Sequence, residues 1–255
     1  MFLAEVKDKK EYRGLSDDFV QRVVAPYTLQ YNIYSEKEKK KCIKECRARL
    51  RELYGAFLVP GYDRRKKYLS SLKKWDDLEY IERILSLHIS SKERLPFYPK
   101  LYAKLQSMIH YSSVLDLAGG MNVFSLPYMG HVHYYGLEVN KDDVDFCNMY
   151  LEKFKLMGGV RWGDILSFDT FVKTDVTFLF KILEGLESVE RGSTEKLLKR
   201  IRSPYIVASF ATRSLGGGKV ISARRLKWFE QLVPVHEKFS LGGEVYYVFK
   251  REHVK

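Results

Sequence analysis

The length, charge and composition of this chain restrict the classes of protein to which it can belong. It has 255 residues, 45% of them hydrophobic, and 44 Lys and Arg against 32 Asp and Glu, a formal net charge of +12. That is enough for one α/β domain and a smaller basic unit. No apolar stretch approaches the roughly 20 residues that cross a bilayer, and no secretory signal pattern opens the sequence. We therefore expect a cytoplasmic protein without a membrane segment.

The positive charge is concentrated in the first part of the chain. Residues 1–105 carry 24 basic and 15 acidic residues, whereas residues 106–255 carry 20 and 17. A basic unit beside a nearly neutral one favours RNA binding, with a lysine-rich solvated surface as the alternative. Of the three cysteines, Cys42 and Cys46 lie four residues apart in a basic run and match neither a disulfide framework nor a zinc site. We expect no bound metal.

Helical patterns fill residues 1–105. The segment 35–54 has Ser35 as an N-cap with Glu38 three residues later, an apolar stripe, and Gly55 as its stop. Periodicity and the intervening proline and turn residues predict further helices at 17–25, 62–72, 76–87 and 96–110. No strand is expected in this part, so we predict an all-helical basic domain at 1–105.

Short strands begin after residue 112 and alternate with helices. Apolar, β-branched or aromatic runs bounded by turn residues occur at 113–118, 132–137, 160–162, 175–180, 205–210 and 244–249, with helical patterns at 141–154 and 193–201. This alternation predicts a parallel sheet covered by helices on both faces. The fold expected at 106–255 is therefore a Rossmann-like α/β domain.

The ends of the first two predicted strands suit a nucleotide. Asp116 and the small residue Ala118 lie at the end of the first strand, Gly119 and Gly120 follow it, and Glu138 follows the second. In an open α/β sheet the ligand lies at the carboxyl ends of the strands. Small residues let the backbone approach it, and the Glu138 carboxylate is placed to accept hydrogen bonds from both ribose hydroxyls.

S-adenosylmethionine fits this pattern better than a dinucleotide. The third glycine of G-x-G-x-x-G is absent, since Phe124 and Ser125 follow the loop, and Asp116 suits a ligand with a cationic amino-acid end. Asp164, after the run 160–162, is expected to accept from the adenine amino group. A turn or helix cap is the common alternative for one such carboxylate, so the prediction depends on the order and spacing of all of them.

Several segments resemble the aminoglycoside-resistance 16S ribosomal RNA guanine-N7 methyltransferase family. They are 180–188, 207–217, 228–230 and 241–247, with 12–13, 53–57, 62–63 and 87–97 in the helical part; the most specific stretch is Ser-Phe-Ala-Thr-Arg-Ser-Leu-Gly-Gly, within 207–217. The resemblance implies a class I S-adenosylmethionine-dependent methyltransferase that acts on guanine N7 in the small (30S) ribosomal subunit. Aminoglycoside resistance and a housekeeping modification both stay open as the role of this activity.

The resemblance also implies which residues contact the methyl donor. They are His88, Ile89 and Ser90, Arg94 at the methionine carboxylate, Gly119 or Gly120, Glu138 at the ribose, Asp164 and Ile165 at the adenine, and Phe180. The chain departs from the family in having Glu138 in place of Asp and Gly119 in place of Cys. It also lacks prolines near Val123 and Glu184.

Methylation of guanine N7 needs positioning rather than proton removal, because N7 carries an available lone pair. We therefore expect no catalytic acid–base pair. Lys181 and Arg213 are candidates for holding the target nucleotide, with ordinary surface charge as the alternative, and Trp228 is either a stacking residue or part of the core. The predicted RNA-facing residues are the run 37–41, Lys44, Arg47, Arg49, Arg51, Arg64, Arg65, Lys66 and Lys67.

Two alternatives stay open on the sequence alone. One is the same chemistry on another structured RNA, such as transfer RNA, and the other is a non-catalytic RNA-binding or assembly protein with this fold. The basic N-terminal part argues against a small-molecule methyltransferase. A monomer is expected.

Overall fold

The computed structural model describes residues 2–32, 34–214 and 218–255. Its helices are α1 (Phe2–Lys7), α2 (Asp17–Gln30), α3 (Glu36–Leu53), α4 (Arg65–Ser71), α5 (Leu78–Leu85), α6 (Ile89–Arg94), α7 (Tyr98–Met108), α8 (Leu126–Met129), α9 (Lys141–Lys153), α10 (Leu183–Val189), α11 (Ser193–Arg200) and α12 (Lys227–Leu232). Its strands are β1 (Ser113–Leu117), β2 (His133–Glu138), β3 (Gly158–Trp162), β4 (Val176–Phe180), β5 (Tyr205–Ala211), β6 (Glu237–Leu241) and β7 (Glu244–Lys250). No helix among these residues is both long and apolar enough to cross a membrane.

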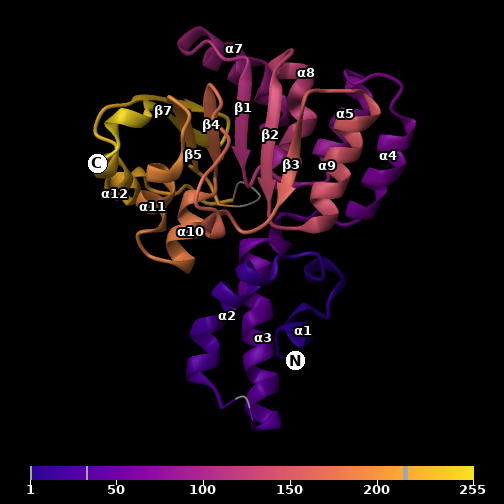
Figure 1. Ribbon diagram of the computed structural model, residues 1–255, viewed down its shortest axis with the longest axis vertical. Coiled ribbons are helices and arrows are strands. Elements are labelled where there is room, and N and C mark those ends of the chain that lie inside the picture. Colours follow the sequence, from indigo (N-terminus) through magenta and orange to yellow (C-terminus); the bar gives the residue numbers. More distant parts are fainter. Residues whose placement is uncertain (1, 33, 215–217) are drawn as a thin grey trace.

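The molecule has a narrow helical arm and a wider α/β body (Figure 1). We call α1, α2 and α3 the arm; its own hydrophobic core includes Val6, Val20 and Leu50. The later helices α4, α5 and α7 instead share a core with the sheet, where Leu101 packs in the same cluster as Val114. The helices of the first part of the chain are therefore divided between two hydrophobic cores. A domain boundary at residue 105 stays a prediction.

The sheet is mixed, with the order β3-β2-β1-β4-β5-β7-β6. The first five strands pair in parallel, as predicted, whereas β7 pairs antiparallel with β5 and with β6. Strand β6 was not predicted, because Glu237–Leu241 is short and has only two apolar residues, Phe239 and Leu241. Gly242, with a φ of 62°, and Gly243 form the tight turn that forces the last two strands to run antiparallel.

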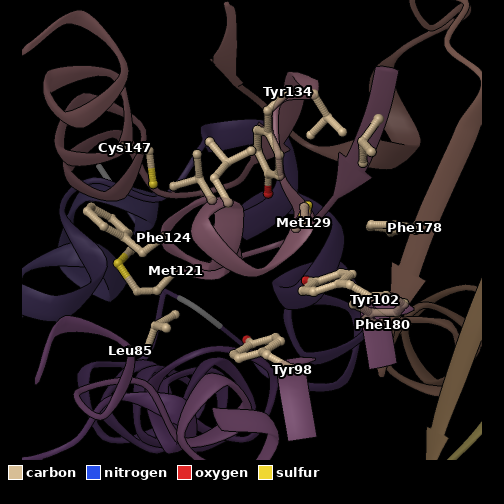
Figure 2. Close-up of a cluster of buried hydrophobic side chains, with 14 of the residues drawn as sticks. Leu85, Tyr98, Tyr102, Met121, Phe124, Met129, Tyr134, Cys147, Phe178 and Phe180 are labelled. Carbon is tan, nitrogen blue, oxygen red and sulfur yellow. The ribbon is translucent and has the colours of Figure 1, made fainter. Parts of the chain in front are cut away.

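Side chains of the central strands alternate between two cores, one on each face of the sheet. On β4, Val176, Phe178 and Phe180 belong to the cluster beneath α4, α5, α7 and α9, and Leu179 belongs to the cluster beneath α10, α11 and α12. This is the two-residue period of a strand buried on both sides. Figure 2 shows Tyr98 and Tyr102 of α7 in the same cluster as Phe178 and Phe180.

The helices follow the predicted periodicity with differences at their ends. The segment predicted at 35–54 is α3, and those at 76–87 and 96–110 contain α5 and α7. Helix α2 continues past Pro26 to Gln30, beyond the predicted end, although the proline cannot donate the backbone hydrogen bond at its position. Helix α6 was not predicted; its six residues are too few for a periodic signal.

Candidate functional site

A cleft lies at the carboxyl ends of β1, β2 and β4, between the body and the arm. The body lines it with Ala118, Gly119, Gly120, Asn122, Glu138, Asp143, Asp164, Ile165, Phe180 and Lys181, the segment before α7 with His88, Ser90 and Arg94, and the arm and the residues after it with Phe19, Leu53, Tyr54 and Phe57. Nine of the ten residues expected to contact a donor are on this wall, and Ile89 is not. Sequence patterns did not indicate that residues of the arm line the cleft, because this depends on how the arm packs against the body.

The loop after β1 requires small residues for a steric reason. A Cβ on Gly119 would lie 2.6 Å from Cγ of Asp116, and Gly120 has a φ of 56°. Ala118 also adopts a positive φ, of 58°, and its N–H donates to the Leu137 carbonyl at 2.8 Å. Positive φ in a non-glycine residue carries strain that such loops often hold at functional sites.

A buried polar network supports this loop from below. Oδ2 of Asp116 accepts from Asn122 Nδ2 and from the Tyr134 hydroxyl, both at 2.7 Å, and Oδ1 of Asn122 accepts from the Tyr98 hydroxyl at 2.9 Å. Asp116, which the sequence placed against a cationic ligand group, is fully buried, and burial raises its pKa. Sequence reasoning missed the two tyrosines because they lie on distant elements.

Glu138 is held at the end of β2 with its carboxylate on the cleft. Oε2 accepts from the Gly120 N–H at 3.0 Å and Oε1 from the Val139 N–H at 2.8 Å. These bonds leave acceptor capacity on both oxygens. Burial, and then the Asp143 carboxylate, raise the pKa of Glu138 to about 7.

Asp143 joins the segment after the arm to the body, and it binds a residue that was expected to face RNA. Its carboxylate accepts from the hydroxyls of Tyr54 at 2.7 Å and Tyr62 at 3.1 Å, and it is paired with the Arg65 guanidinium. The Arg65 side chain is only 6% exposed. The prediction that Arg65 faces RNA is therefore wrong. Within a run of four basic residues, the sequence could not tell which one turns inward.

A second buried charge network lies at the floor of the cleft. Arg94 Nε donates to Glu244 Oε1 at 2.9 Å, and Lys181 Nζ lies 3.3 Å from the same oxygen. Ser209 Oγ donates to the other Glu244 oxygen at 2.6 Å, and Lys181 also pairs with Glu93 at 2.6 Å. Buried charges persist only when paired in this way. Glu244 was not predicted as a site residue, since it lies 150 positions from Arg94.

The other predicted RNA and target residues divide between exposed and internal positions. Lys37, Lys40, Lys41, Lys44, Arg51, Arg64, Lys66, Lys67 and Arg213 are exposed. Lys39 pairs with Glu5, Arg47 donates to the carbonyls of Glu5 and Val6, and Arg49 donates to Ser188.

The most specific stretch of the resemblance ends on residues 215–217, which lie outside the described residues. Trp228 packs against the core beside Phe210. Among the residues that the structure describes, no group of three or more His, Cys, Asp or Glu could hold a metal ion.

Comparisons with known proteins agree with one another. The model of the family described as "Ribosomal RNA methyltransferase (FmrO)" matches residues 8–233. A 16S rRNA (guanine(1405)-N(7))-methyltransferase of Serratia marcescens is 30% identical over 254 residues, 98% of this chain and 97% of that protein. The solved structure of the 16S rRNA methyltransferase RmtF in complex with S-adenosyl-L-homocysteine superposes with a TM-score of 0.84 at 28% identity, covering 97% and 95% of the two chains. An rRNA methylase from Escherichia coli gives 0.80 at 27%, covering 98% of each chain.

Proposed function

Because the chain belongs to the FmrO family of ribosomal RNA methyltransferases, we propose that it transfers a methyl group from S-adenosylmethionine to guanine N7 in 16S ribosomal RNA. The observation that carries the proposal is the cleft at the carboxyl ends of β1 and β2, where Glu138 is fixed by the Gly120 N–H beside a basic arm. Fold likeness alone would not assign a reaction; this arrangement of residues supports one.

The chemistry of the cleft fits the methyl donor. Glu138 offers a carboxylate to a ribose diol, Asp164 and Ile165 line the region proposed for adenine, and Arg94 supplies a cation for a carboxylate. Nδ1 of His88 is buried on this wall without a hydrogen-bond partner in the described part of the chain. Burial, followed by the charge of Arg94, lowers the pKa of His88 to about 3, so its ring is neutral at physiological pH.

Positioning is the main contribution that we assign to the protein. When bound, the donor supplies a methyl group on a positively charged sulfur, which a guanine nitrogen with a free lone pair can attack directly. Glu138 and Arg94, which both line the cleft, would hold the donor and fix its orientation. Rate then comes from aligning the methyl group with the incoming base, without an acid–base pair on the protein.

The arm, α4 and Arg64 just before α4 provide the proposed RNA surface. Lys37, Lys40, Lys41, Lys44, Arg64 and Lys67 are exposed there and would contact phosphates of the assembled 30S subunit. Arg213 is proposed to hold the target nucleotide at its phosphate. Lys181, which pairs with Glu93 inside the cleft, is also proposed to hold the target nucleotide. We propose that residues 1–105 serve RNA binding and residues 106–255 donor binding, in a monomeric cytoplasmic enzyme.

Parallel methylation assays test the proposal. Purified 30S subunits and bulk transfer RNA are incubated with radiolabelled S-adenosylmethionine, and N7-methylguanine is located by borohydride reduction and aniline cleavage. Label confined to one 16S RNA position is the expected result. Label confined to transfer RNA would move the activity to another RNA, and the absence of donor binding by calorimetry at micromolar concentration would favour a non-catalytic RNA-binding protein.

A further inference from the structure

Arg22, on helix α2 of the arm, forms three hydrogen bonds to the body. Its Nε donates to Asp164 Oδ2 at 3.0 Å, one terminal nitrogen donates to Glu190 Oε2 at 2.8 Å, and the other donates to Ser167 Oγ at 3.3 Å. These partners belong to the segment after β3 and to the end of α10. A single guanidinium therefore joins the arm to two elements of the body.

Asp164 is the partner that faces the cleft. Its side chain is 2% exposed, and its Oδ1 accepts from the Leu166 N–H at 3.0 Å. Arg22 binds the other oxygen, so both oxygens are anchored and the carboxylate plane is fixed. Oδ2 also accepts from the Ser167 hydroxyl at 3.5 Å, so Oδ1 is the oxygen that keeps a lone pair for a further donor. Phe19, one turn before Arg22 on α2, lines the same cleft.

The position of Arg22 is fixed by backbone contacts around the start of α2. The Ser16 N–H donates to the Val139 carbonyl at 2.9 Å, and the Lys141 N–H donates to the Gly14 carbonyl at 2.8 Å. The indole N–H of Trp162 lies 3.1 Å from the Gly14 carbonyl and 2.9 Å from that of Val139. These bonds connect the arm to the ends of β2 and β3. The orientation of the Asp164 carboxylate therefore depends on how the arm packs against the body.

We propose that Arg22 is a positioning residue for the donor site, which orients the Asp164 carboxylate to accept the adenine amino group and so selects adenine over other purines. The inference rests on the proposed function. Arg22 acts through Asp164 and is not proposed to touch the donor. A site built to accept from an N–H group discriminates strongly against an analogue that lacks it, because the acceptor is then left without a partner.

The test compares S-adenosylhomocysteine with S-inosylhomocysteine, in which an oxo group replaces the adenine amino group. Calorimetry on the full chain should show that the unaltered protein prefers S-adenosylhomocysteine at least tenfold. In Arg22→Ala, the affinity for S-adenosylhomocysteine should fall about tenfold and the preference should shrink to about threefold or less. Arg22→Lys, which keeps the charge but not the forked geometry, should restore part of the preference.

Two further variants separate positioning from simple attachment of the arm. Arg13→Ala is the matched control, because Arg13 lies on the arm, pairs with Asp8 at the surface and is 67% exposed; its donor preference should be unchanged. Glu190→Gln weakens the contact to α10 but leaves the bond from Arg22 to Asp164, so it should keep the preference for adenine.

Each outcome has a distinct meaning. A loss of preference in Glu190→Gln as large as that in Arg22→Ala would show that Arg22 only tethers the arm, and would overturn the inference. Unchanged preference in Arg22→Ala, or no preference in the unaltered protein, would overturn it as well. No binding of S-adenosylhomocysteine to the unaltered protein would instead reject the proposed function. Circular dichroism and melting temperature confirm that each variant is folded.

Discussion

Donor affinity should depend on pH through Glu138. Burial and the neighbouring Asp143 raise the pKa of its carboxyl to about 7, and its ionised form is the better acceptor for the ribose hydroxyls. Binding therefore favours the deprotonated state, and affinity should rise as pH rises through 7. With this pKa, roughly a tenth of the carboxyl is ionised at pH 6 and nine-tenths at pH 8, so S-adenosylhomocysteine should bind about tenfold more weakly at pH 6.

The neighbouring groups do not produce the same profile. His88 has a pKa of about 3 and stays neutral from pH 6 to 8. Arg94, paired with Glu244, has a pKa above its ordinary value and stays charged. Glu138 is therefore the group on the cleft wall that we expect to titrate in this window.

Calorimetry at pH 6, 7 and 8, in two buffers of different ionisation enthalpy, measures both the affinity and the protons released. About one proton should be released per donor bound at pH 6 and almost none at pH 8. Glu138→Gln, which cannot ionise, should bind with the same affinity at all three values. Equal affinities at pH 6 and pH 8 for the unaltered protein, or an undiminished pH dependence in Glu138→Gln, would refute the reasoning.

Three further predictions concern stability, the glycine loop and the RNA surface. Arg65→Ala leaves the Asp143 carboxylate buried without its cation, so the free energy of unfolding in urea should fall by about 3–5 kcal/mol; a loss below about 1 kcal/mol would contradict the buried pairing. Gly119→Ala places a Cβ 2.6 Å from a buried carboxyl carbon, so S-adenosylhomocysteine affinity by calorimetry should fall at least tenfold, and unchanged affinity would show that the loop adapts. Reversing Arg64 and Lys67 to Glu together should lower 30S methylation at least tenfold in a filter assay while preserving donor affinity and melting temperature; full methylation would remove α4 from the RNA surface.

Local patterns in the sequence determined most of the secondary structure and the place of the cleft. The stripe and cap of 35–54 predicted α3, and the apolar runs predicted the five parallel strands. Gly119, Gly120 and Glu138 were found because a strand end, a small-residue loop and a carboxylate recur at a fixed spacing. Such features depend on neighbours in the chain, so periodicity and composition report them.

Tertiary structure decided the partner of each buried charge. Arg65 turned inward to Asp143, Arg94 paired with a glutamate 150 residues away, and Arg22 reached Asp164 across 142 residues. A basic side chain has the same sequence signature whether it faces solvent or a buried carboxylate. Which of the two it does depends on desolvation and on the acids that folding brings within about 3 Å, and a one-dimensional pattern carries no record of those distances.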